Sequence, residues 1–282
     1  MNFSELHASE VAAGERFEFG KNWSQFLSLL NENRIATAEE SLRGWLETDN
    51  LDGKTFLDIG SGSGLFSLAA RRLGAKVHSF DFDPNSVACT AELRRRYFAD
   101  DPLWKVESAS VLDTEYMSSL SEFDIVYSWG VLHHTGKMWE ALENAQRHVK
   151  VGGKLFIALY NDTGSQSSRW KLIKKIYCAV PEMLKGPFAV LISAPQESKL
   201  FLSSIAKLRV GDYVRSWTKY DENRGMNRWR DTIDWVGGYP YEVSTPDETF
   251  EFFKARGFQI SKMKVGKVGL GCYQFVFTRT RH

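Results

Sequence analysis

The most constraining stretch of this sequence is a glycine-rich turn between an apolar strand and a helix. It reads TFLDIGSGSGLFSLAARRLGA, covers residues 55–75, and has glycines at positions 60, 62 and 64. Glycine lets the backbone turn tightly and approach a ligand, and the free amide groups at the start of the helix can bind polar oxygens. A strand that runs through such a turn into a helix is typical of an open α/β sheet. We therefore expect a nucleotide-like ligand at this turn.

Strands and helices alternate on both sides of the turn. Strands are expected at 54–59, 76–81, 103–108, 123–128 and 154–160, and helices at 64–73, 84–97 and 136–149. This alternation predicts βαβ units and a parallel sheet. A helix at 245–257 then precedes strands at 258–265 and 272–279, which a short link makes an antiparallel pair. The expected fold is α/β, a doubly wound, mostly parallel seven-stranded sheet with an antiparallel strand.

The same patterns divide the chain into three regions. Residues 1–50 look helical and are expected to form an N-terminal helical lid, in which Trp23 either closes over the ligand or packs the helix. Residues 51–162 and 243–282 are expected to form the ligand-binding domain, with 163–242 inserted as a helical cap. The insertion includes two helical stretches that mix apolar and basic residues, with Pro181, Pro187 and Pro195 between them.

Charge is unevenly distributed between these regions. The whole chain has a formal net charge of +1, so it has no overall bias toward nucleic acid or membrane. The segment from Arg169 to Arg230, however, contains 13 Lys or Arg and only 5 Asp or Glu, which gives it a charge of +8. The insertion is therefore a basic cap.

Composition indicates the class of protein and its compartment. Hydrophobic residues make up 43% of the chain and charged residues 25%, which allows a large core and excludes disorder. Three widely spaced cysteines form neither a disulfide framework nor a zinc-ligand cluster. The N-terminus has no apolar run of a secretory signal, and no stretch reaches the roughly 18 apolar residues of a membrane span. We expect a cytoplasmic protein.

The spacing of the glycines separates two kinds of ligand. A dinucleotide-binding turn of the form GxGxxG would need a glycine at position 65, where this chain has Leu65. The spacing here is GxGxG, which weakens the interpretation as a nicotinamide-dependent oxidoreductase. Asp81 ends the second strand about twenty residues after the turn, where a carboxylate can accept hydrogen bonds from ribose hydroxyls. Both ligand classes use such a carboxylate.

Two further segments make the resemblance to a family specific. FDIVYSWGVLHHTG (123–136) and VKVGGKLFIALYND (149–162), read with the turn and the closing antiparallel strands, resemble class I S-adenosylmethionine-dependent methyltransferases. The similarity covers about 54–160 and 245–280 and extends to ubiquinone-pathway small-molecule methyltransferases. It implies S-adenosyl-L-methionine as cofactor and methyl transfer as the reaction.

The resemblance also implies roles for individual residues. The methionine part of the cofactor would be lined by Asp58, Gly60, Ser61, Gly62 and Gly64. Asp81 would hold the ribose, Phe82 would flank the adenine, and Ser110 and Val111 would lie at the adenine edge. Trp129 and Gly130 would lie near the sulfonium, where an aromatic face attracts a cation. Packing roles for Phe82 and Trp129, and a capping role for Asp58, are the alternatives.

Catalytic candidates follow the fourth and fifth strands. A neutral histidine can take a proton from an attacking hydroxyl or amine, so His133 and His134 are candidate bases. Adjacent residues point in different directions, so at most one faces the donor, and His134 is favoured. Asp162 is the runner-up base, with a turn-forming role as its alternative. Ubiquinone-pathway enzymes carry acidic residues, in a pattern associated with a divalent metal, where this chain has Gly130 and His133, so no metal is expected.

The basic cap is the indicator of the methyl acceptor. It favours a small anionic or lipid-like metabolite, with peripheral contact to a membrane through the cap and no nucleic acid partner. A solvated helical face is the alternative. Three functions stay open on the sequence: methyl transfer to an oxygen or nitrogen atom, of which RNA or peptide acceptors are variants, nicotinamide-dependent oxidation, and noncatalytic nucleotide binding. The sequence does not determine the oligomeric state.

Overall fold

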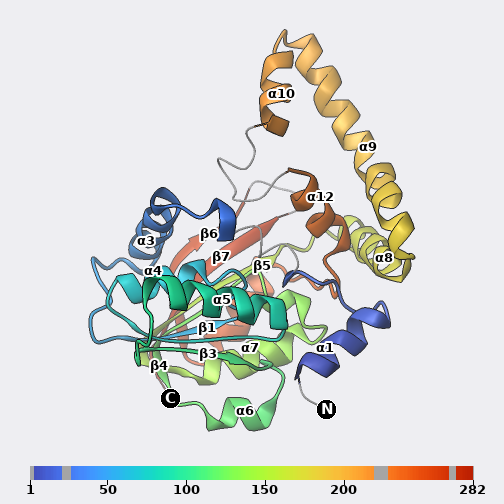
Figure 1. Ribbon diagram of the computed structural model, residues 1–282. Helices are drawn as coiled ribbons and strands as arrows, with labels where there is room; N and C mark the ends of the chain where they lie inside the picture. The colour runs from blue at the N-terminus through green and yellow to red at the C-terminus, as the bar shows by residue number, and fades with distance from the viewer. Residues whose placement is uncertain (1–2, 21–26, 219–227, 267–270, 282) are drawn as a thin grey trace.

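A computed structural model describes residues 3–20, 27–218, 228–266 and 271–281 (Figure 1). These residues form one seven-stranded sheet with the strand order β3-β2-β1-β4-β5-β7-β6. The strands are β1 (Thr55–Ile59), β2 (Lys76–Asp81), β3 (Trp104–Ser108), β4 (Phe123–Trp129), β5 (Val149–Tyr160), β6 (Phe258–Lys264) and β7 (Cys272–Arg279). Strands β1 to β5 pair in parallel, and β7 runs antiparallel to both β5 and β6. The α/β fold expected from the sequence is confirmed.

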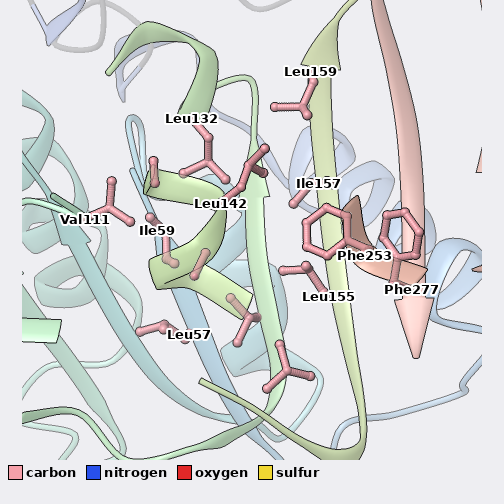
Figure 2. Close-up of a cluster of buried hydrophobic side chains, with 14 of the residues drawn as sticks. Leu57, Ile59, Val111, Leu132, Leu142, Leu155, Ile157, Leu159, Phe253 and Phe277 are labelled. Carbon is pink, nitrogen blue, oxygen red and sulfur yellow. The ribbon is translucent and has the colours of Figure 1, made fainter. Parts of the chain in front are cut away.

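Helices cover both faces of the sheet, because successive residues of each buried strand point to opposite sides. Leu155, Ile157 and Leu159 of β5 pack with Leu142 and Phe253 in a core on one face, which Figure 2 shows. That face is covered by α6 (Thr114–Ser119), α7 (Met138–Arg147) and α13 (Pro246–Lys254). The other core is covered by α3 (Glu32–Leu46), α4 (Leu65–Arg72) and α5 (Pro84–Tyr97).

The region expected to be an N-terminal lid divides into two parts. Helix α1 (Phe3–Ala12) and the segment that follows it lie beside the carboxyl ends of the strands, where His7 and Arg16 line a cavity. Helix α3 instead contributes Ile35 and Leu42, both fully buried, to the core it shares with α4. The expectation for Trp23 lies outside the described residues.

The cap is helical, as expected, but its helices begin and end at other residues. They are α8 (Ser165–Ala179), α9 (Glu182–Ala206), α10 (Val210–Thr218) and α12 (Arg228–Gly237). Pro187 and Pro195 were expected to separate helices, and this was wrong, since both lie inside α9. A proline deprives the carbonyl four residues earlier of its donor. Here those carbonyls belong to the exposed residues Met183 and Leu191, where water can hydrate them.

The buried face of α3 leads to a test of its role in the core. Replacing Leu42 by Ala should lower the free energy of unfolding by about 2–5 kcal/mol, because it leaves a cavity in a packed core. The matched control is Met183→Ala, whose side chain is 83% exposed on α9 and should have little effect. Urea denaturation measures both changes. Equal stabilities of the two variants would contradict a structural role for α3.

Candidate active site

A large cavity opens at the carboxyl ends of the parallel strands. Its volume is about 1380 Å³, and its wall comes from the sheet, the N-terminal segment and the cap. The sheet side includes residues expected from the sequence to bind the cofactor: Asp58, Gly60, Ser61, Gly62, Asp81, Phe82, Ser110, Val111, Trp129 and Gly130. His134 and Tyr160 lie on the same wall. The structure thus brings together side chains that follow four different strands.

The glycine turn has the geometry that its sequence predicts. Gly60, Gly62 and Gly64 have φ angles of 77°, 54° and 78°, which side chains with a Cβ rarely adopt. A Cβ atom on Gly60 would lie 2.3 Å from Val131 Cγ1, so the turn passes close to the loop after β4. Gly64 does not line the cavity, contrary to expectation. A Cβ there would lie 2.8 Å from Thr90 Cα, so Gly64 serves the close packing of α4 on α5.

Two carboxylates lie behind the turn. Asp81 accepts hydrogen bonds from the backbone N–H groups of Gly62 and Asp83, each at 2.9 Å. Asp58 accepts a hydrogen bond of 2.5 Å from the Ser67 hydroxyl. Burial raises the pKa of Asp58 to about 7 and that of Asp81 to about 6, and the negative charge of Asp81 adds to the shift at Asp58. Their protonation therefore changes near neutral pH.

The N-terminal segment closes the side of the cavity near Phe82. The guanidinium of Arg16 lies 4.8 Å from the centre of the Phe82 ring, and its Nη1 donates a 3.1 Å hydrogen bond to the carbonyl of His134. Asp83 Oδ2 accepts a hydrogen bond from the Gly20 N–H at 2.7 Å and lies 3.5 Å from His7 Nε2. The segment is thus joined to the loops after β2 and β4.

The residues that follow β3 and β4 differ in exposure. Val111 is buried in the core, although it also lines the cavity, while the Ser110 hydroxyl accepts a hydrogen bond from the Leu112 N–H at 3.1 Å. Trp129 is 45% exposed, and Gly130 beside it has a φ of 76° with open space where a Cβ would be. An indole with this exposure is available to a ligand in the cavity, which favours a binding role for Trp129 over packing.

The two histidines have different surroundings. His134 lines the cavity, and its Nδ1 lies 2.6 Å from the carbonyl oxygen of Pro240. Because a carbonyl only accepts, Nδ1 carries the proton and Nε2 keeps its lone pair. Burial and the charge of Lys174 lower the pKa of His134 to about 3, so the ring is neutral at physiological pH. His134 is thus a hydrogen-bond acceptor at the cavity wall.

His133 does not line the cavity. Its ring is completely buried 4.0 Å from the Tyr160 ring, and its nitrogens have no hydrogen-bond partner among the described residues. Burial lowers its pKa well below the usual value. Of the two histidines only His134 lies on the cavity wall, and its role as a base stays a prediction.

Asp162 also lies away from the cavity. Its side chain is exposed, and Oδ1 accepts a hydrogen bond from the Gly164 N–H at 2.8 Å, immediately before α8. This is the turn-forming role, which a carboxylate two residues before an amide commonly takes. The expectation that Asp162 is the runner-up base does not fit this position.

Sequence reasoning missed the segment that holds the site together, residues 237–244. Besides the contact from Pro240 to His134, the N–H of Glu242 donates to the His133 carbonyl, and the Glu242 carboxylate accepts from the Met138 N–H, each at 2.9 Å. A Cβ on Gly237 would lie 2.5 Å from the Phe17 ring, so only glycine fits there. The sequence WVGGYPYE carries a signal for this, since paired glycines and a proline indicate a constrained turn.

Lys174 of α8 is the second feature that was missed. It is fully buried, its ammonium donates to the carbonyl of Trp235, and it lies 4.8 Å from the Trp235 ring and 5.1 Å from the Tyr241 ring. Burial lowers its pKa to about 7. Nothing in the local sequence distinguishes this lysine from its exposed neighbours Lys171 and Lys175.

Metal ligands are not grouped in the part of the chain that the structure describes. No cluster of three or more His, Cys, Asp or Glu side chains there could hold a metal ion.

Comparison with known proteins identifies the central domain. Residues 57–155 match the family model described as methyltransferase domain. A ubiquinone biosynthesis O-methyltransferase from Schizosaccharomyces pombe is 28% identical over 165 residues, which is 56% of this chain and 58% of that protein. A ribosomal protein L11 methyltransferase from Methylococcus capsulatus is 30% identical over 115 residues, 40% of this chain and 36% of that protein. The matches thus span between about a third and three fifths of these curated relatives.

A solved structure agrees in fold. Magnesium protoporphyrin IX methyltransferase from Synechocystis, crystallised with bound SAH, superposes with a TM-score of 0.52, covering 92% of this chain and 94% of that one at 13% identity. Residues 57–155 thus match a methyltransferase domain, and the fold around them is shared with a solved methyltransferase structure. The resemblance noted in the sequence is thereby confirmed for the methyltransferase domain, whose glycine turn and β4 lie within the matched residues.

The hydrogen bond to Pro240 predicts the protonation of His134 in this methyltransferase domain. Its imidazole should remain neutral, with the proton on Nδ1, throughout pH 5–8, because burial lowers its pKa to about 3. Nitrogen-15 NMR of histidine-labelled protein measures the tautomer and the titration, with His134→Gln assigning the signal. A titration midpoint near the ordinary histidine pKa of about 6.5 would contradict this geometry.

Proposed function

We propose that this chain transfers a methyl group from S-adenosyl-L-methionine to an oxygen or nitrogen atom of a small anionic or lipid-like molecule. The observation that carries the proposal is a single cavity that joins the glycine turn and Asp81 to a chamber under the cap. A methyl donor bound at the turn would have its reactive end directed toward Trp129, His134 and Tyr160. We assign the reaction to the cytoplasm.

The residues at the sheet edge suit the proposed cofactor. Gly60 and Gly62 line the cavity with no side chain of their own, and Asp81 ends β2 where a ribose can be held. Phe82 and Val111 offer apolar surface to the adenine. Trp129 offers an exposed aromatic face to the sulfonium, an attraction of about 0.5–2 kcal/mol.

The acceptor would bind on the cap side of the cavity. Tyr160, Trp170 and Trp235 give this side an aromatic wall, and Lys207, Arg209 and Arg228 bring positive charge to it. Arg228 is paired with Glu197 at 2.7 Å and Arg209 with Asp212 at 2.5 Å, and Asp231 and Asp234 line the same side, so most of this positive charge is compensated within the cap. An anionic group on the acceptor is proposed to meet Lys207, with an apolar or aromatic part on the wall.

S-adenosylmethionine supplies an electrophilic methyl group when bound. The protein's contribution is chiefly alignment, which can provide up to about 7–11 kcal/mol when the reacting atoms are held in line. His134 offers the lone pair of Nε2 to the proton of the attacking hydroxyl or amine. With a pKa of about 3 it is a weak base, so it orients the nucleophile more than it removes the proton.

The identity of the ligand distinguishes this proposal from its rivals. Isothermal titration calorimetry should show that S-adenosylhomocysteine binds and that NAD does not, because the GxGxG turn lacks the third glycine of a dinucleotide site. Binding of NAD alone would overturn the proposal in favour of an oxidoreductase. Tight binding of S-adenosylhomocysteine without turnover of any small molecule, peptide or RNA would favour a noncatalytic module.

Protonation of Asp81 should control cofactor affinity. Only the carboxylate accepts hydrogen bonds at both oxygens, and burial raises its pKa to about 6. We expect the Kd for S-adenosylhomocysteine to rise as the pH falls through about 6, because protonation then competes with binding. Asp81→Asn should bind at least about tenfold more weakly and lose this pH dependence.

The control is Asp124→Asn, which changes a carboxylate at the opposite end of the sheet, 2.9 Å from Lys150. It should leave the Kd and its pH dependence unchanged. An affinity that stays constant between pH 5 and 8 in the unmodified protein would contradict the role assigned to Asp81.

A further inference from the structure

Helix α9 carries an apolar stripe that nothing in the described structure covers. We define the α9 stripe by Met183, Leu184, Val190, Leu191, Leu202 and Ile205, whose side chains are 45–83% exposed. At 3.6 residues per turn, these six positions fall within an arc of about 120° and extend over about 33 Å. Pro187, Ala194, Ser198 and Phe201 fall in the same arc, so it contains no ionisable residue.

The opposite side of α9 is occupied by the protein. Ala189 and Ile192 pack in the core of the cap, and Gln196 and Ser203 line the cavity. In Figure 1, α9 extends away from the sheet and α10 folds back along it, so the pair forms an arm that projects from the body. Helix α10 contacts the arc at Phe201, whose ring lies 5.2 Å from the Tyr213 ring, while the six residues of the stripe stay exposed.

The charges around the stripe indicate what it contacts. The segment from Arg169 to Arg230 carries a net charge of +8. On α8, the exposed Leu172 and Ile176 alternate with the exposed Lys171 and Lys175, so apolar and basic side chains share one surface. A second copy of this chain would bring the same positive charge to the contact, which opposes pairing of two arms. An anionic lipid surface complements the charge and accepts the apolar side chains.

We infer that the α9 stripe inserts into the interface of an anionic membrane, with α9 lying parallel to the membrane surface. No described helix is long and apolar enough to cross a bilayer, so the attachment is peripheral. In this arrangement the exposed Lys171 and Lys175 of the neighbouring helix α8 meet the lipid headgroups, while the apolar side chains of the stripe reach the acyl boundary. The charge of the cap alone indicated only a peripheral contact with a membrane. The α9 stripe adds a defined apolar surface that inserts into it.

The same arrangement indicates how the acceptor reaches the cavity. This part of the inference rests on the proposed function. Since Gln196 and Ser203 line the cavity from the side of α9 opposite the stripe, insertion would hold the cap end of the cavity at the lipid surface. A lipid-like acceptor would then enter from the membrane, with its tail beside the arm and its headgroup under the cap.

Vesicle co-sedimentation of the full chain tests the assignment. The protein should sediment with vesicles of phosphatidylglycerol and phosphatidylcholine, and more weakly with phosphatidylcholine alone. Leu191→Glu combined with Leu202→Glu should reduce binding to the anionic vesicles at least about tenfold, because two carboxylates would have to enter the interface. The matched control is Met263→Glu, which places a carboxylate at a 55% exposed apolar residue of β6 and should bind normally.

Three other measurements test whether the double variant is folded, whether it still binds the cofactor product, and whether the protein forms a dimer. The double variant should retain its circular dichroism spectrum and its affinity for S-adenosylhomocysteine, since the stripe touches neither core nor cofactor site. Binding that the double substitution leaves unchanged, or no binding at low salt, would overturn the inference. So would a dimer in analytical ultracentrifugation that the double variant dissolves, which would assign the stripe to a second copy. Vesicle binding without affinity for S-adenosylhomocysteine would contradict only the proposed function.

Discussion

The site depends on one constraint, the close approach of the glycine turn after β1 to the loop after β4. A Cβ atom on Gly60 would lie 2.3 Å from Val131 Cγ1. Carbon atoms in ordinary contact are about 3.5–4.0 Å apart, so no side chain fits there. The turn must therefore be built from residues that tolerate positive φ and occupy little space. With the turn in this place, Gly62 can donate its N–H to Asp81, which joins the edges of β1 and β2. The carboxyl ends of neighbouring strands thereby become one binding surface.

The second half of the site is assembled by a segment far along the chain. Residues 237–244 contact the loop after β4 through Pro240 and Glu242, and Ser244 exchanges backbone hydrogen bonds with the end of β5. The Phe17 N–H also donates to the Tyr239 carbonyl, so the N-terminal segment is held by the same turn. The cap, the N-terminal segment and the sheet therefore meet at His134, and all three determine its environment.

That environment explains why the chemistry proposed here relies on alignment. A histidine that is buried beside Lys174 stays neutral, and a neutral ring with a low pKa holds a nucleophile without removing its proton fully. S-adenosylmethionine needs little more, because its methyl group is already activated. The large cap then has two roles in the proposal, to enclose the acceptor on one side of α9 and to meet the lipid surface on the other.

Much of the fold was predictable because short sequence patterns specify its strands, helices and turns. Most strands and helices from β1 to β5 were expected within a few residues of their observed ends, since alternation and glycine turns act over short distances in the chain. Helix α6 was not expected, and β5 begins at Val149 instead of 154. The glycine turn, Asp81 and the methyltransferase family followed from residues adjacent in the sequence. Pro187 and Pro195 were misread because local rules end a helix at a proline, whereas exposure of the freed carbonyls decided otherwise.

The sequence by itself therefore determined the α/β class, the order of its elements and the edge of the sheet where a ligand binds. Only the tertiary structure decided which of two adjacent histidines reaches the cavity, since this depends on Pro240, which lies 106 residues away. It likewise separated Gly64 and Asp162 from the cavity wall, buried Lys174, and left the α9 stripe uncovered. The physical reason is common to these cases: burial and contact depend on residues distant in the chain, which periodicity and spacing do not encode.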